Sequence, residues 1–549
     1  MLEPNVTDIT RRGGDSGNFR AMATRPLTLA DVLETMADTV PDRPAIVTLD
    51  HTWTFAELDE RANRFAHMLL DAGVQPGTHV AVHSPNRVEW IDAFYGSFKI
   101  GAVPINVNYK YLAEELRHIY SNSDSTVAVV APEFEALARE AAGDLVEHWF
   151  VMGEQYDAAT AAASPERPQV ERSGDDRYMI YTGGTTGMPK GVEWRQEDLI
   201  RAALNAARYG APLEGLDQLA AEAKAVENPM VLLACGPMMH GGSQWIMGNG
   251  HVAGQTIGFF TDANFSAERV LDLVQHAGVV SLTFLGDAMG RPVAEAILAE
   301  PDRWDLSSLA AVSNGAAPLS IGVREEIRKA LPGRFILDSY GASETGAAGS
   351  SMDDGSSDGK ARFNIGPDVD VLGADDRPTQ VGEEGMLARS GPMPLGYYKD
   401  PVKTAATFKE IDGKRWVIPG DFARKEPDGS IIVLGRGSVC INSGGEKIYP
   451  EEVESALLRH PDIFDAAVTG TPHERWGQQV TALVQLREDA DLTEAQVVEH
   501  VKSLLANYKA PKRVFFVDQV PRTPVSKVDY KATAETAAAL VAESAGAPA

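Results

Sequence analysis

The chain has 549 residues, of which 44% are hydrophobic and 23% charged, a composition typical of a globular protein with two to four domains. Its formal net charge is -28, from 50 Lys and Arg against 78 Asp and Glu. This negative excess repels polyphosphate backbones and argues against nucleic-acid binding, so an anionic ligand must meet a local cluster of basic side chains.

Only two cysteines occur, Cys235 and Cys440, without the spacing of a disulfide framework or a zinc site. The first residues lack the apolar core of a signal peptide, and the longest weakly polar run, 231–260, is interrupted by His, Gln, Asn and many Gly. We therefore expect a cytoplasmic protein with no integral membrane segment.

The first part of the chain alternates predicted strands and helices. Residues 1–24 are expected to be a disordered leader, and the capping box of Thr54 and Glu57 predicts a helix that ends at Gly73. The predicted elements that follow are a strand at 79–83, a helix at 88–99 and a buried strand within 119–132. This alternation predicts an α/β protein with a mainly parallel sheet.

The later part changes in composition. Residues 211–229 are acidic and rich in Ala, which predicts a helical insertion. The buried strands VVSLTFLG and FILDSY each run into a Gly- or Ser-containing loop, where open α/β sheets bind ligands. After a strand at 430–436, a smaller α+β unit is predicted over about 437–535, and the low-complexity tail at 536–549 is expected to be disordered.

The stretch YTGGTTGMPKGV at 181–192 offers unhindered backbone N–H groups, Thr hydroxyls and the ammonium of Lys190. These are the donors that phosphate groups need. The loop is not of the Walker A type, because Lys190 follows Pro189 and precedes Gly191. A plain surface turn is the alternative for TGG alone, whereas the full string favours phosphate binding.

This string resembles the phosphate-binding signature of the adenylate-forming superfamily, which comprises acyl-CoA synthetases, peptide-synthetase adenylation domains and luciferases. Gly184 stands where that signature usually has Ser or Thr. The likeness spans nearly the whole chain, since the other family motifs follow in order. It implies a large N-terminal domain (25–435) of α/β subdomains with mainly parallel sheets plus a β-barrel-like portion, a hinge (436–440), a mobile α+β C-terminal domain (441–535) and a disordered tail (536–549).

The resemblance also implies an ATP and Mg²⁺ site. The string DSYGASET at 338–345 matches the family's Tyr-Gly-x-Thr-Glu motif. By this likeness Tyr340 stacks on adenine, Asp338 accepts from its amino group, Ser343 contacts the α-phosphate and Glu344 holds Mg²⁺; a carboxylate suits such a hard cation. The full set of expected nucleotide-binding residues is Thr182, Gly183, Gly184, Thr185, Thr186, Gly187, Lys190, Gly315, Ala316, Asp338, Ser339, Tyr340, Gly341, Ser343, Asp421, Arg436 and Lys527.

Within that set, the likeness gives Asp421 the ribose hydroxyls and Arg436 the ribose and phosphate. Lys527 takes the place of the family's adenylation lysine; the alternative is an ordinary solvated lysine near the C terminus. The expected catalytic residues are Lys527, Glu344, Thr182 and Lys190. Two departures from the family pattern occur, Ser438 at the hinge and Ser526 before the lysine.

The same resemblance implies sites for two further substrates. The residues expected to line the tunnel for coenzyme A are Ser443, Gly444, Gly445 and Lys447. Those expected at the acyl pocket are His240, Gly241, Trp245, Gly286 and Met289. For His240 a packed structural role is the alternative.

The implied reaction has two steps: a carboxylate attacks the α-phosphorus of ATP to give acyl-AMP, and the thiol of coenzyme A then displaces AMP. Because Lys527 and the 444–447 loop lie on one small domain, a domain rotation between the steps is expected.

Several longer strings look most like bacterial fatty-acid CoA ligases of the mycobacterial steroid-side-chain type, which favours a bulky hydrophobic acid such as a sterol or bile-acid side-chain carboxylate. The alternatives are a medium- or long-chain fatty-acid CoA ligase, a free-standing adenylation enzyme that loads a carrier protein, and a non-catalytic adenylate binder. The sequence leaves open whether the chain forms a homodimer.

Overall fold

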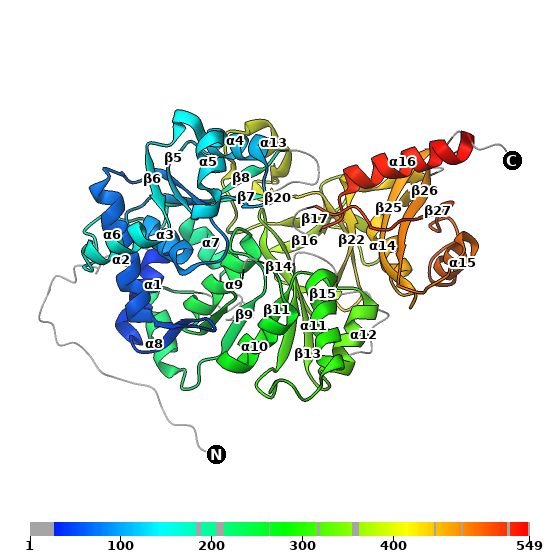
Figure 1. The fold of residues 1–549 in the computed structure, drawn as a ribbon. Helices are drawn as coiled ribbons and strands as arrows, with labels where there is room; N and C mark the ends of the chain where they lie inside the picture. The colour runs from blue at the N-terminus through cyan, green and yellow to red at the C-terminus, as the bar shows by residue number, and fades with distance from the viewer. Residues whose placement is uncertain are drawn as a thin grey trace, which may run out of the picture.

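The computed structural model describes residues 27–182, 188–204, 213–262, 264–315, 319–353, 362–443, 446–473, 476–523 and 527–546 (Figure 1). The predicted leader lies outside these ranges, as do the loop residues 183–187. No helix within the described ranges is long and apolar enough to cross a membrane.

A four-stranded parallel sheet forms the N-terminal layer. Its strands run in the order β4 (Val103–Asn106), β3 (His79–His83), β5 (Ser125–Val130) and β6 (His148–Val151). Val80, Ala81 and Val82 are fully buried, as expected for a parallel strand covered on both faces. The helices of this region are α1 (Leu29–Thr39), α2 (Phe55–Asp71), α3 (Val88–Lys99), α4 (Ala113–Asn122), α5 (Glu135–Ala142) and α6 (Glu154–Ala162).

The predicted capping box is confirmed, since Thr54 and Glu57 exchange side-chain and backbone hydrogen bonds at the start of α2. The helix ends at Asp71, two residues before the predicted Gly73. Behind it, Lys99 at the end of α3 is fully buried, and its Nζ lies 2.8 Å from Glu34 Oε1 and 2.6 Å from Asp59 Oδ1. A buried ammonium is tolerated only when paired, so this cluster fixes α1, α2 and α3 relative to one another.

The second sheet has 15 strands, and six neighbouring strands in it are parallel. The parallel strands, in spatial order, are β13 (Phe335–Ala342), β12 (Ala311–Asn314), β11 (Val279–Phe284), β9 (Val231–Ala234), β10 (Thr256–Phe259) and β1 (Pro44–Val47), with β2 (Thr52–Thr54) antiparallel at the edge. The helices that follow these strands are α9 (Gly241–Val252), α10 (Ala267–Ala277), α11 (Asp287–Ala299) and α12 (Ile321–Ala330) (Figure 1). The predicted α/β class with mainly parallel sheets is confirmed.

Beyond β13 the same sheet continues with antiparallel strands. They are β14 (Gly346–Asp353), β15 (Arg362–Ile365), β22 (Ile431–Arg436), β21 (Asp421–Lys425), β17 (Glu384–Arg389), β20 (Lys414–Val417) and β19 (Phe408–Ile411), with β16 (Val369–Leu372) on β17. A separate sheet joins β18 (Gly396–Tyr397), β8 (Lys190–Arg195) and β7 (Arg177–Thr182). The remaining helices of the large domain are α7 (Gln196–Ala202), α13 (Pro401–Thr407) and α8 (Leu216–Ala225), the last within the predicted helical insertion.

A smaller α+β domain with its own hydrophobic core lies to one side of this body (Figure 1). Its elements are β23 (Ile441–Ser443), β24 (Glu446–Ile448), α14 (Pro450–Leu457), β25 (Ile463–His473), β26 (Gly477–Leu486), α15 (Glu494–Leu504), β27 (Arg513–Phe516) and α16 (Tyr530–Gly546). The tail expected to be disordered from 536 is helical through Gly546, so that prediction is wrong there. Ala is the best helix former, and the fully buried Ala537 lies on α16, which packs on β25.

Candidate active site

Three predicted nucleotide-binding side chains meet in the antiparallel part of the long sheet. Asp421 opens β21 and Arg436 closes β22, and the register places them directly opposite each other. Arg436 Nε donates to Asp421 Oδ1 at 3.1 Å, and the hydroxyl of Tyr340 on β13 donates to Oδ2. Burial, together with the charge of Asp421, holds the pKa of Tyr340 well above its usual value, so the phenol remains a donor.

The predicted magnesium ligand, Glu344, lies in the turn between β13 and β14 and accepts a hydrogen bond from the hydroxyl of Tyr397 at 2.7 Å. Tyr397 comes from β18, which pairs with β8, and Lys190 of β8 places its Nζ 5.9 Å from the Tyr397 ring centroid. Lys190 also forms an ion pair with Asp400 at 2.6 Å. One tyrosine thus connects the lysine of the phosphate loop with the predicted metal ligand.

The residues present fit a magnesium ion. Mg²⁺ is commonly held by one or two carboxylates together with substrate phosphates and water. The described part of the chain contains no cluster of three or more His, Cys, Asp or Glu that could bind a metal ion without a substrate. Glu344 supplies the one carboxylate that is needed when substrate phosphates and water complete the coordination.

Lys527 of the small domain is hydrogen-bonded to the nearby residue Thr523. The backbone N–H of Thr523 donates to the carbonyl of Lys527 at 2.8 Å, and the N–H of Lys527 donates to the Thr523 hydroxyl at 3.2 Å. Arg522, next to Thr523, forms an ion pair with Asp465 of β25. These main-chain and neighbouring bonds hold Lys527 in place without using its ammonium.

That ammonium lies within electrostatic reach of the large-domain site. The side chain of Lys527 is exposed, but the surrounding protein partly desolvates its ammonium. This desolvation is the main cause that lowers the pKa of Lys527. The charge of Arg436 lowers it further, while Glu344 and Asp421 oppose the shift. Lys527 therefore lies within electrostatic range of Arg436, Glu344 and Asp421.

The predicted acyl-pocket residues lie where two neighbouring parallel strands, β9 and β11, pass into helices. His240, Gly241 and Trp245 belong to the start of α9, while Gly286 and Met289 belong to the start of α11. Burial first, then the charges of Lys527 and Lys110, lowers the pKa of His240 to about 4, so its imidazole is neutral at physiological pH.

A Cβ at Gly241 would lie 2.8 Å from Ile180 Cδ1, so a larger residue there would force the end of that side chain to move. At the residues predicted to lie against adenine, a Cβ on Gly341 would lie 2.3 Å from the Gly346 carbonyl oxygen, whereas a Cβ on Gly315 would lie at an ordinary 3.7 Å from the Ser339 carbonyl oxygen. The carbonyl of Ser343 accepts from the indole of Trp194 at 3.0 Å, which holds the loop between β13 and β14.

Several predicted residues stay predictions. Thr182 ends β7 opposite Lys190, but the loop residues Gly183, Gly184, Thr185, Thr186 and Gly187 lie outside the described residues, as does Ala316. For coenzyme A, Ser443 ends β23, while Gly444 and Gly445 lie outside the described residues, as do the side chains of Lys447 and Ser438.

A buried carboxyl group that no sequence motif predicts lies at the domain junction. Glu451 on α14 accepts from the backbone N–H of Arg436 at 3.3 Å, and a Cβ on Gly435 would lie 2.3 Å from its Oε2. That oxygen is buried without a partner among the described residues. Burial is the main cause that raises the pKa of Glu451 to about 7, and the charge of Asp421 adds to it. The only sequence signal for the close packing of Glu451 is the pair Gly435-Arg436, because a glycine permits close approach.

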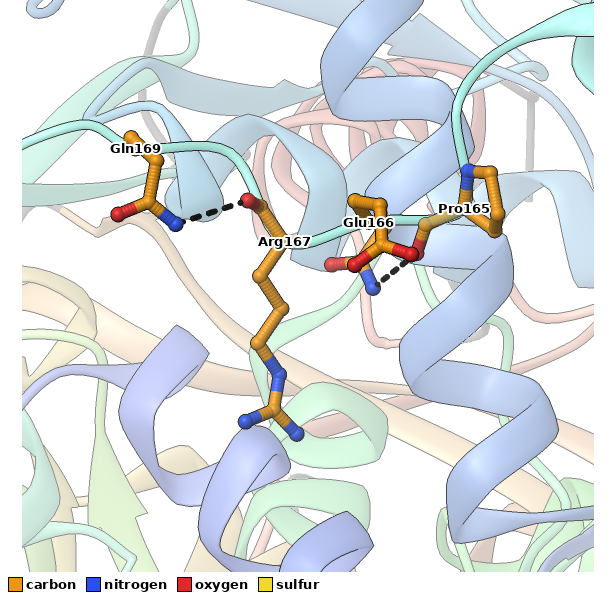
Figure 2. A pocket seen from close by; sticks show the side chains of 5 residues that line it. Pro165, Glu166, Arg167 and Gln169 are labelled. Carbon is orange, nitrogen blue, oxygen red and sulfur yellow. Dashed lines mark hydrogen bonds between the residues drawn. The ribbon is translucent and has the colours of Figure 1, made fainter.

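A cavity of about 500 Å³ lies elsewhere, beside α2 (Figure 2). It is lined by Asn63, Pro165, Glu166, Arg167 and Gln169, none of which is a predicted site residue. The guanidinium of Arg167 is already paired with Asp38 and Asp59. The cavity therefore takes no part in the site described above.

Comparison with known proteins matches both parts of the chain. The family described as "AMP-binding enzyme" matches residues 33–398, and "AMP-binding enzyme C-terminal domain" matches residues 452–527. The chain is 41% identical over 530 residues to the 3-oxocholest-4-en-26-oate–CoA ligase of Rhodococcus rhodochrous, which covers 92% of this chain and 95% of that protein. Identity and coverage are the same for the medium/long-chain-fatty-acid–CoA/3-oxocholest-4-en-26-oate–CoA ligase of Mycolicibacterium smegmatis.

Among solved structures, ATP-bound MatB from Rhodopseudomonas palustris superimposes with a TM-score of 0.79 at 26% identity, covering 93% of this chain and 99% of that chain. The chain belongs to the AMP-binding enzyme family. The resemblance drawn from its motifs is thereby confirmed.

Proposed function

We propose that this protein is an ATP-dependent, AMP-forming acyl-CoA synthetase that activates a bulky hydrophobic carboxylic acid. The observation that carries the proposal is the convergence of Lys527 with Arg436, Glu344 and Asp421, contributed by both domains. The named activities of the relatives that are 41% identical over 92% of this chain support an acid–thiol ligase.

The first step needs charge cancellation more than bond chemistry from the protein. A carboxylate is a poor nucleophile, and the α-phosphorus that it attacks is surrounded by negative oxygens, so catalysis rests on positioning and electrostatic stabilisation. Lys527 and Lys190 provide ammonium groups, and Asp421 with Tyr340 orients the nucleoside. Mg²⁺, when held by Glu344 and phosphate oxygens, supplies further positive charge.

In the second step the thiol of coenzyme A attacks the acyl carbon and AMP leaves. Lys527 and the 444–447 loop belong to the same small domain, so we propose that this domain rotates about residues 436–440 between the steps. Coenzyme A then approaches along the glycine-containing loop, where small residues permit close contact.

For the substrate, we propose a sterol or bile-acid side-chain carboxylate, with medium- and long-chain fatty acids as the second candidate. The pocket residues named above are small or apolar apart from the neutral His240, which suits an apolar acid. The names of the two 41% identical relatives contain both substrate types. We also propose a cytoplasmic location, which rests on the cysteine usage of the sequence.

One assay separates the candidates. The purified protein is given ATP, Mg²⁺ and a panel of acids (3-oxocholest-4-en-26-oate, cholate, octanoate and palmitate), with and without coenzyme A, and AMP and thioester are quantified by mass spectrometry. Thioester that requires coenzyme A is the expected result. Acyl-AMP with no thioester would instead indicate an adenylation enzyme that loads a carrier protein. Absence of AMP with every acid would overturn the proposal.

A further inference from the structure

The two carboxylate oxygens of Asp338, a predicted nucleotide-binding residue, differ in their hydrogen bonds: one accepts two hydrogen bonds and the other accepts none from the described residues. Asp338 on β13 lies opposite Asn314 on β12 and is 4% exposed. Its Oδ1 accepts from Arg324 Nη2 at 2.8 Å and from Asn314 Nδ2 at 3.1 Å. Its Oδ2 is buried and has no hydrogen-bond partner in the part of the chain that the structure describes.

The guanidinium that saturates Oδ1 is itself held rigidly. Arg324 on α12 is 7% exposed, and its Nε donates to the carbonyl of Leu319 at 3.0 Å while Nη1 lies 3.3 Å from Asp353 Oδ2. Because a guanidinium is planar with fixed donor directions, these contacts leave one orientation for the group that meets Asp338. Burial lowers the pKa of Arg324, but its bonds and charge interactions with Asp338 and Asp353 outweigh this and raise it above its usual value.

We infer that Arg324 is a positioning residue for nucleobase selection: it holds Asp338 as an acceptor-only carboxylate whose free Oδ2 admits a purine with an amino group at position 6. The inference rests on the proposed function, since it takes Asp338 as the contact to the base. It adds a residue 14 positions earlier in the chain that decides what Asp338 can recognise.

Adenine and hypoxanthine differ in the group that they present at position 6. Adenine presents an N–H donor at position 6, which pairs with a bare carboxylate oxygen. Hypoxanthine presents a carbonyl oxygen there, so two acceptors would face each other in a buried place, the kind of mismatch that sites discriminate most strongly. Arg324 also fixes the direction in which the unpaired oxygen points, so without it Asp338 can turn and no longer presents an acceptor to the amino group of adenine.

The test compares three nucleotides, ATP, ITP and purine riboside triphosphate, which has neither donor nor acceptor at position 6. The value of kcat/KM for acyl-AMP formation is measured together with equilibrium binding of each nucleotide. The wild type is expected to prefer ATP over the unsubstituted purine, and that purine over ITP. In Arg324→Met the ratio of kcat/KM for ATP to kcat/KM for ITP is expected to fall by about tenfold to hundredfold, which corresponds to the free energy of one charge-assisted hydrogen bond.

The matched control is Arg328→Met. Arg328 pairs with the same Asp353 at 2.6 Å from the same helix, but Asp338 is not among its ion-pair partners, so the ratio should stay as in the wild type. An unchanged ATP-to-ITP ratio in folded Arg324→Met overturns the inference. If that variant does not fold, Arg324→Lys is used instead; it keeps the positive charge but lacks the planar guanidinium, so it must lower the ATP-to-ITP ratio. An unchanged ratio in Arg324→Lys also overturns the inference. A wild type that neither binds nor uses ATP refutes the proposed function instead.

Discussion

Lys527→Ala should separate the two half-reactions. An ammonium about 4 Å from a phosphate oxygen, at an effective dielectric constant of about 20, contributes about 4 kcal/mol, which corresponds to a rate factor of about 10³. This dielectric suits Lys527, which is open to solvent yet surrounded by protein on a wider radius. We therefore expect ATP–pyrophosphate exchange to fall by about 10³, while conversion of supplied acyl-AMP to thioester stays within about threefold of wild type.

The local structure should survive this substitution, because its hydrogen bonds use the backbone of Lys527 and the hydroxyl of Thr523. Lys531→Ala serves as the matched control: it removes an exposed lysine of the same domain, at the start of α16, and should leave both half-reactions unchanged. Equal loss in both assays for Lys527→Ala, or no loss in either, would refute the assignment of the lysine to adenylation.

Three further predictions concern side chains away from that lysine. The pKa of Glu451 is raised to about 7, so between about pH 4.5 and pH 7 its carboxyl stays protonated in the folded protein but ionises in the unfolded chain, and the folded protein loses stability as pH rises through this range. Glu451→Gln should therefore increase the free energy of unfolding more at pH 8 than at pH 5, by up to about 3 kcal/mol in urea titrations; an equal effect at both pH values contradicts this. Tyr397→Phe removes the hydrogen bond to Glu344 and should weaken Mn²⁺ binding to the ATP complex, followed by electron paramagnetic resonance, by about tenfold or more. Unaltered Mn²⁺ affinity would show that the bond does not position the carboxylate. Lys99→Met removes the cation that Glu34 and Asp59 share, while each carboxylate keeps an arginine partner, and should lower the free energy of unfolding by about 1–3 kcal/mol in urea titrations; an unchanged free energy would argue against it.

Local patterns predicted local structure well. The capping box at Thr54 and the helix at 88–99 depend on residues three or four positions apart, so a single sequence contains them. The prediction of a disordered tail was wrong because of a tertiary contact. The tail has the composition of a disordered chain end, but it forms a helix where α16 packs on β25. Burial of one face stabilises a helix whose propensity alone leaves it marginal.

By itself the sequence determined the class of enzyme and the order of its motifs, because the motifs are short contiguous strings that resemble those of a known family. Only the tertiary structure decided which side chains act on these motif residues. Tyr397 reaches Glu344 across 53 positions, and Arg324 reaches Asp338 from a helix packed beside the strand. Such contacts are set by strand order and register, which bring distant segments together and which no local spacing in the chain encodes.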